Sequence, residues 1–79
     1  MNLNHRLQNA ISGVVGVPTD SITDESSPET IPEWDSLNHL NIVMALEGEY
    51  GVSLEIDDVL EMHNVGMIRK ILAKYGVEA

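Results

Sequence analysis

The chain has no cysteine, which removes the usual covalent supports of a small domain. Neither a disulfide nor a thiolate-bound metal ion can therefore compensate for a small core. The three histidines, His5, His39 and His63, lie on separate segments without metal-ligand spacing, so we expect no metal site. Its 79 residues suit a single domain, placed over residues 1–79, whose core must come from packed aliphatic side chains.

Basic residues and long apolar runs are also scarce. Thirteen acidic residues against four basic ones give a formal net charge of −9, which argues against nucleic-acid binding. No run approaches the roughly 20 apolar residues of a membrane span. Residues 1–15 lack the continuous apolar segment of a signal peptide. We therefore expect a cytoplasmic, monomeric protein without a membrane span, whose protein partners present basic surfaces.

Spaced aliphatic residues predict four helices, because they follow the periodicity of an amphipathic helix. We expect long helices over residues 3–15, 36–50 and 64–75 and a short third helix over residues 57–62. Gly16 and Gly51 follow the first two long helices, as is usual at a C-terminus, and Asn64 suits the N-cap of the last. The predicted fold class is all-α, a small four-helix bundle with a long first loop over residues 16–35.

Three segments carry more specific expectations. The first helix should bury Leu3, Leu7, Ala10, Ile11, Val14 and Val15, and the second should bury Leu37, Leu40, Val43, Met44, Leu46 and Tyr50. The long loop should be ordered, because Ile22, Ile31 and Trp34 are spaced along it as apolar anchors. Gly48 lies inside the second helix, where glycine costs about 1 kcal/mol relative to alanine.

The pair Asp35-Ser36 lies where the acidic loop meets the second helix. Asp35 suits the N-cap, because its carboxylate can accept from unpaired backbone N–H groups. Ser36 then falls in the exposed first turn, where a phosphate ester would lie near the positive end of the helix dipole. These residues alone allow an ordinary cap or a serine displayed for modification. A small serine hydrolase using His39 is disfavoured, because the chain has no G-x-S-x-G motif and little room for a substrate pocket.

Further motifs follow Asp35-Ser36-Leu37 along the chain. They are the "VMALE" run with its following acid and tyrosine, the acidic short helix, and Asn64-Val65 opening the last helix. With these motifs, the chain resembles the acyl carrier protein family over almost its whole length. The resemblance implies that a separate phosphopantetheinyl transferase moves 4′-phosphopantetheine from coenzyme A to Ser36, recognising Asp35 and Leu37 and using Mg²⁺. Such a carrier is not an enzyme; it presents thioester-bound acyl groups to other enzymes.

The resemblance also implies a partner face on the second and third helices. Its candidate residues are the acids Asp35, Glu47, Glu49, Asp57, Asp58 and Glu61. They would meet basic docking patches on acyl-loading and acyl-processing enzymes, and the simpler interpretation is a solvated surface.

Four positions depart from the pattern of fatty-acid carriers. Trp34 stands where those carriers usually have glycine, and Asn38, Asn41 and Gly48 stand along the second helix, where they tend to have more acids. We expect Trp34 to cover the edge of the bundle rather than to contact the arm. The departures favour a carrier of a specialised pathway over a housekeeping fatty-acid carrier. Two further hypotheses are an aminoacyl or peptidyl carrier and an unmodified acidic interaction domain.

Overall fold

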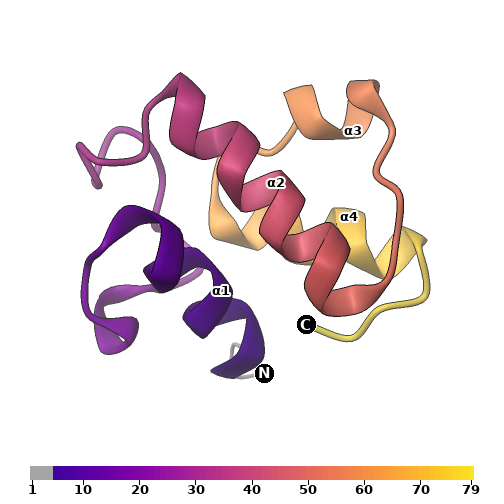
Figure 1. The fold of residues 1–79 in the computed structure, drawn as a ribbon, viewed down its shortest axis with the longest axis horizontal. Coiled ribbons are helices and arrows are strands. Elements are labelled where there is room, and N and C mark those ends of the chain that lie inside the picture. Colours follow the sequence, from indigo (N-terminus) through magenta and orange to yellow (C-terminus); the bar gives the residue numbers. More distant parts are fainter. Residues whose placement is uncertain (1–4) are drawn as a thin grey trace.

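The computed structural model describes residues 5–79, and all regular elements in this range are helical. They are α1 (His5–Val15), the single 3₁₀ turn η1 (Thr19–Ser21), α2 (Ser36–Tyr50), α3 (Ile56–Leu60) and α4 (Val65–Lys74). α2 crosses the middle of the molecule, with α1 to one side and α3 and α4 to the other (Figure 1). The prediction of an all-α, four-helix fold is confirmed.

The first and last helices bury most of the side chains that their periodicity indicates. Ala10 and Val14 of the first helix, which the spacing also places in the buried stripe, are only partly buried. In α1, Leu7, Ile11 and Val15 are spaced by four residues and all face the core. In α4, the buried residues are Val65, Ile68, Ile71 and Leu72. Leu3, which was expected to extend the stripe of α1, lies outside the described residues.

The predicted apolar face of α2 is wrong at three positions. Leu37, Leu40 and Met44 are 69%, 53% and 60% exposed, whereas the helix buries Ile42, Val43 and Leu46. At 3.6 residues per turn, the exposed three lie almost opposite Ile42 and Leu46 on the helix circumference. α2 is therefore apolar on two sides, and periodicity alone does not indicate which side meets the core.

The long first loop is ordered because it supplies both apolar anchors and polar partners. Ile22, Ile31 and Trp34 are buried, as predicted. The carbonyl groups of Ser26 and Asp24 accept hydrogen bonds from the N–H groups of Val65 (3.0 Å) and Gly66 (3.0 Å). These two N–H groups begin α4 and have no partner within that helix. The loop thus completes the N-terminal end of α4.

A salt bridge fastens the same loop to the side of α4. The guanidinium of Arg69 donates through Nη1 to both carboxylate oxygens of Asp24, at 3.0 and 2.8 Å. The Arg69 side chain is 21% exposed, so solvent screens this contact less than it screens a fully exposed pair. The loop is consequently held to α4 through its backbone and through a charged side chain.

A polar cluster around Asp58 holds α3 against the C-terminal end of α4. The Asp58 carboxylate accepts hydrogen bonds from Lys74 Nζ (2.6 Å) and Tyr75 OH (2.6 Å), and Tyr75 OH accepts one from Glu55 N (3.0 Å). The hydrogen bonds from Lys74 and Tyr75, with the positive charge of Lys74, hold the pKa of Asp58 below its ordinary value. A five-residue helix is unstable alone, so α3 depends on such contacts for its place.

Replacing Gly48 by alanine is expected to stabilise the fold. A Cβ at Gly48 would meet nothing within 4 Å, and alanine in a helix interior is favoured by about 1 kcal/mol. Thermal unfolding should then occur roughly 4–8 °C higher. Gly51→Ala is the contrasting variant, because Gly51 ends α2 at φ 65°, where a side chain is strained. A G48A protein no more stable than the unaltered chain would contradict this prediction.

The Asp58 cluster predicts a specific pH dependence of stability. Because the pKa of Asp58 is lower in the folded chain, its stabilisation is present above the ordinary carboxyl pKa of about 4 and is lost as the pH falls through the lower, folded value. Asp58→Asn should therefore lower the melting temperature at pH 7, and its difference from the unaltered chain should shrink on acidification. Asp57→Asn, at an exposed neighbour, is the control. An equal, pH-independent effect of both variants would contradict the prediction.

Candidate functional site

Ser36 is the first residue of α2 and is exposed to solvent. Asp35 precedes it in an extended conformation (φ −94°, ψ −174°), and its carboxylate accepts a hydrogen bond from the N–H of Asn38 at 2.9 Å. The Asp35 carbonyl accepts from the N–H of His39 at 2.8 Å, which starts the backbone hydrogen bonding of the helix. Asp35 is thus the N-cap, and it presents Ser36 on a defined helical turn.

Two asparagines support this turn from the side. Asn38 donates through Nδ2 to the carbonyl of Glu33 (2.7 Å), and Asn41 donates through Nδ2 to Oδ1 of Asn38 (3.1 Å). The chain entering α2 is therefore tied to the first two turns of the helix. The sequence analysis considers these two asparagines only as positions where fatty-acid carriers tend to have acidic residues. The amide at Asn38, three residues after the N-cap, was the signal for a side chain that reaches back to the loop.

Trp34 lies under the site and away from solvent. Its side chain is 2% exposed, and its Nε1–H donates to Nδ1 of His39 at 3.1 Å. Trp34 belongs to the hydrophobic core of the bundle. That it does not contact the arm stays a prediction.

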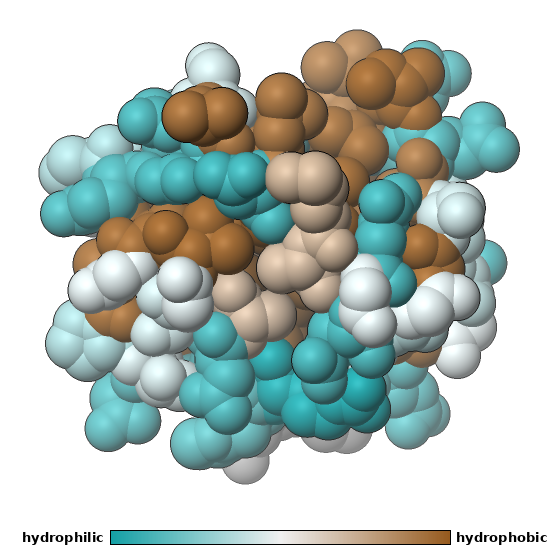
Figure 2. Space-filling view, in the orientation of Figure 1, coloured by the Kyte–Doolittle hydropathy of each residue, from teal (hydrophilic) through white to brown (hydrophobic). Residues whose placement is uncertain are grey.

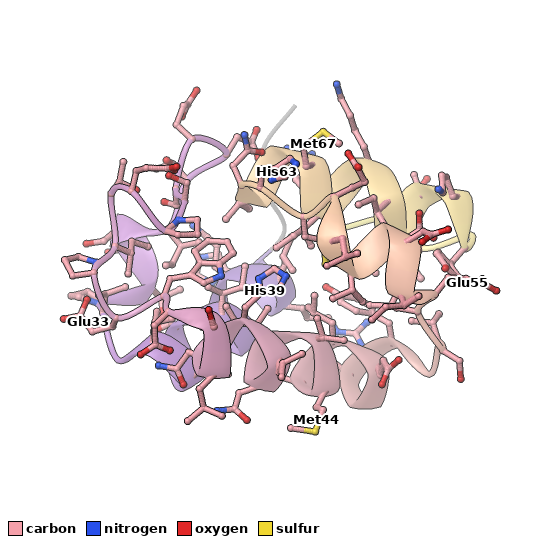
Figure 3. The ribbon with its side chains drawn as sticks, turned by 90° about the horizontal axis from the view of Figure 1, so that it is seen from above. Glu33, His39, Met44, Glu55, His63 and Met67 are labelled. Carbon is pink, nitrogen blue, oxygen red and sulfur yellow. The ribbon has the colours of Figure 1, made fainter. Side chains whose placement is uncertain are left out.

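His39 uses both of its ring nitrogens inside the protein. Nδ1 meets Trp34, and Nε2 lies 3.0 Å from the carbonyl oxygen of Val59 in α3. The imidazole points inward between the helices, whereas Met44 on the same helix points away from them (Figure 3). Neither nitrogen is therefore available to take a proton from Ser36, which argues against a serine hydrolase built on this segment.

The residues around Ser36 fit a covalently attached phosphate ester. The first turn of α2 contains no acidic residue, and its N–H groups provide the positive end of the helix dipole. Leu37 is 69% exposed beside the serine, and so is available to an approaching protein. Other serines fit less well: Ser26 and Ser27 are buried, and the Ser12 hydroxyl donates to the carbonyl of Val17.

The expected acids of the partner face are not equally available. Glu47 accepts a hydrogen bond from the N–H of Leu54 (2.8 Å) and so fixes the connection that follows α2. Glu49 pairs with Arg6 of α1 at 2.7 Å.

Asp58 is engaged by Lys74 and Tyr75, whereas Asp57 and Glu61 are exposed, with His63 Nε2 3.9 Å from Glu61. The structure therefore leaves Asp57 and Glu61 on α3 and its end, and Asp35 beside Ser36, as the candidate acids with the most accessible positions.

Exposed apolar side chains lie instead on α2, which Ser36 begins, and on α3. We define the apolar face as the five large apolar residues of the described range 5–79 that are more than half exposed: Leu37, Leu40, Met44, Ile56 and Leu60. They come from α2 and α3, and hydrophobic atoms line the upper edge of the molecule over the start of α2 and over α3 (Figure 2). Sequence reasoning missed this face. The spacing of Leu37, Leu40 and Met44 indicates this exposed face, but the sequence analysis places these three side chains in the core.

None of the helices in residues 5–79 is long and apolar enough to cross a membrane. The family described as a phosphopantetheine attachment site matches residues 5–72. An acyl carrier protein of Acidothermus cellulolyticus is 32% identical over 73 residues, covering 92% of this chain and 87% of that protein. Members of the family are not themselves enzymes; they carry 4′-phosphopantetheine covalently on a serine, placed there by a transferase. The chain belongs to the phosphopantetheine-binding family of acyl carrier proteins.

Proposed function

We propose that the chain carries acyl groups as thioesters on a 4′-phosphopantetheine arm attached to Ser36. The observation that carries this assignment is the exposed serine directly after the Asp35 cap, at the start of the longest helix. The hydroxyl oxygen of Ser36 attacks the phosphorus of coenzyme A that bears the pantetheine and becomes the ester oxygen of a phosphodiester. The pyrophosphate bond of coenzyme A breaks in the same step, and adenosine 3′,5′-bisphosphate leaves. The hydroxyl proton leaves to a base on the transferase, because the nearby His39 has both nitrogens engaged.

The neighbours of Ser36 provide the local recognition. Asp35 keeps one carboxylate oxygen on the N–H of Asn38, and we place it beside the transferase and near its Mg²⁺. Leu37 offers an exposed apolar contact next to the reacting hydroxyl. The dipole of α2 favours the negative phosphate at this end of the helix.

We further propose that partner enzymes dock on the apolar face, with acids at its margin. Enzymes that reach the arm must approach the start of α2, where Leu37 and Leu40 are exposed. Burying such side chains supplies affinity, whereas charges at the rim mainly adjust the rate of encounter and selectivity. Asp57 and Glu61 suit the rim role and would meet basic residues of the partner. Glu47, Glu49 and Asp58 contribute less, because they already have partners within the chain.

Residues around the arm support a specialised pathway rather than housekeeping fatty-acid synthesis. Trp34 occupies the position before Asp35 and is packed beneath it, while Asn38 and Asn41 make the face beside Ser36 less negative. A basic patch matched to a highly acidic carrier would therefore gain less here. The second candidate is the housekeeping fatty-acid carrier, since the chain is also similar over most of its length to a protein named simply an acyl carrier protein. Because attachment of the arm consumes coenzyme A, we propose that either kind of carrier works in the cytoplasm.

Transfer of the arm is expected to depend on Ser36 alone among the six serines. After incubation with coenzyme A, Mg²⁺ and a phosphopantetheinyl transferase, intact-mass measurement should record one added arm. Ser36→Ala should record none while melting at the same temperature, since the Ser36 side chain is exposed. Ser21→Ala and Ser53→Ala, at two other exposed serines, should be modified like the unaltered chain. An arm on the S36A protein, or no arm on the unaltered folded chain, would refute the assignment.

Truncation within the apolar face is expected to weaken docking. Leu40→Ala should raise the KM of the transferase for the carrier roughly fivefold or more, because apolar area is no longer buried on binding. Its melting temperature should change little, as Leu40 is 53% exposed.

Two charge variants separate the apolar contribution to docking from the electrostatic contribution. Asp57→Asn should have a smaller effect that disappears at high salt, and Asp20→Asn, on exposed η1, should have none. An unchanged KM for the L40A protein, with a large salt-sensitive effect of D57N, would contradict docking on the apolar face.

A further inference from the structure

His39 has a role in the structure that arm attachment does not use. Its side chain is half-buried and lies between the start of α2, the end of the first loop and α3 (Figure 3). Trp34 donates to it from the loop at 3.1 Å, and Val59 meets it from α3 at 3.0 Å. A single imidazole therefore connects three segments that converge next to Ser36.

The partners of His39 determine its tautomer. An indole N–H can only donate and a carbonyl oxygen can only accept. Nδ1 must therefore be the acceptor for Trp34, and Nε2 must carry the proton that is donated to Val59. The two ring planes are inclined by 19°, with centroids 6.2 Å apart. The bridge needs one acceptor and one donor on the same side chain, and a neutral imidazole with its proton on Nε2 supplies both.

This bridge bears on the place of α3 relative to Ser36. α3 has five residues, of which Val59 is buried, and it carries Ile56 and Leu60 of the apolar face. The Asp58 cluster holds it to α4, but the contact to the beginning of α2 passes through His39. The N–H of His39 also bonds to the carbonyl of Asp35, so the same residue belongs to the turn that presents Ser36.

We propose that His39 is a positioning residue for arm attachment and partner docking. Through its Nε2–H tautomer it fixes the part of the apolar face on α3 at a set position relative to Ser36. The inference rests on the proposed function, because it assumes that partners bind the apolar face while acting at Ser36. An apolar residue at position 39 would leave the Trp34 N–H without its acceptor. The Val59 carbonyl would lose its side-chain donor and keep the backbone hydrogen bond from the N–H of Met62 at 3.3 Å. α3 would then shift relative to Ser36.

The first experiment examines the tautomer in the unaltered chain, without any partner. Two-bond ¹H–¹⁵N NMR at neutral pH distinguishes imidazole rings protonated at Nε2 from those protonated at Nδ1. His39 should be a single Nε2–H tautomer, and the Trp34 indole proton should exchange slowly with solvent. His5, exposed at the start of α1, serves as the internal reference for an unconstrained ring. A Nδ1–H form, or a tautomer mixture like that of His5, would overturn the proposal.

The second experiment measures arm transfer with purified transferase and coenzyme A. His39→Leu removes both side-chain hydrogen bonds, of which the one to Val59 holds α3. It should raise the KM for the carrier roughly two- to tenfold, the range expected for the loss of that single contact, with kcat little changed. His39→Gln keeps a donor and an acceptor on one amide and should largely restore the KM. His5→Leu is the matched control and should behave as the unaltered chain.

Each outcome of these measurements bears on one claim. Failure of the unaltered chain to accept an arm contradicts the proposed function, whereas failure of the inference appears only in the variants. If the unaltered chain is modified normally and the H39L protein has the same KM, His39 does not position the docking surface. Equal defects in the H39L and H39Q proteins would overturn the bridge as well. If the H39L protein does not fold, the tautomer and the KM of the H39Q protein decide the question.

Discussion

A helix that is apolar on two opposite sides, in a chain able to bury only one of them, underlies the rest of this structure. α2 directs Ile42 and Leu46 into the core and leaves Leu37, Leu40 and Met44 in solvent. Within residues 5–79, no other element covers the side that carries these three residues. In the proposed function this side is the docking surface, because exposed apolar patches of this kind mark interaction sites.

The proposed attachment site requires the opposite property, a start of α2 that hydrogen bonds hold in place. Asp35 caps the helix, Asn38 ties it to Glu33, and His39 connects it to Trp34 and Val59. Ser36 is consequently exposed on a turn that Asp35 and Asn38 hold in place. Positioning of this kind lets a transferase meet a preformed surface, without the entropic cost of ordering a loop. A long first loop is compatible with this rigidity because it is itself anchored in the core and at the start of α4.

The sequence was sufficient for the helical fold and for the cap, since both depend on local signals. The four-residue spacing of Leu7, Ile11 and Val15 indicates a buried stripe, and aspartate before a serine indicates an N-cap. It was insufficient for α2, where two apolar stripes compete and only tertiary packing selects Ile42 over Leu40.

Long-range pairs were equally beyond local reasoning. Local patterns do not indicate that Glu49 is paired. In the structure its carboxylate meets Arg6, which lies 43 residues earlier in the chain. Asp58 similarly meets Lys74 and Tyr75 only after α3 folds against the end of α4. The bridge through His39 depends on three segments at once, and a histidine three residues after a serine first suggests catalysis. The family resemblance supplied the role proposed for Ser36, whereas the structure shows that both ring nitrogens of His39 are engaged elsewhere.

The central claim is that Ser36 alone bears the arm, and the most direct test maps the modification in the unaltered chain. The chain is treated with coenzyme A and a phosphopantetheinyl transferase, then fragmented in the mass spectrometer to locate the added group. The account predicts that the whole addition lies between Asp35 and Leu37, with none at Ser21 or Ser53. An addition at either of those serines, or none at Ser36, would contradict it.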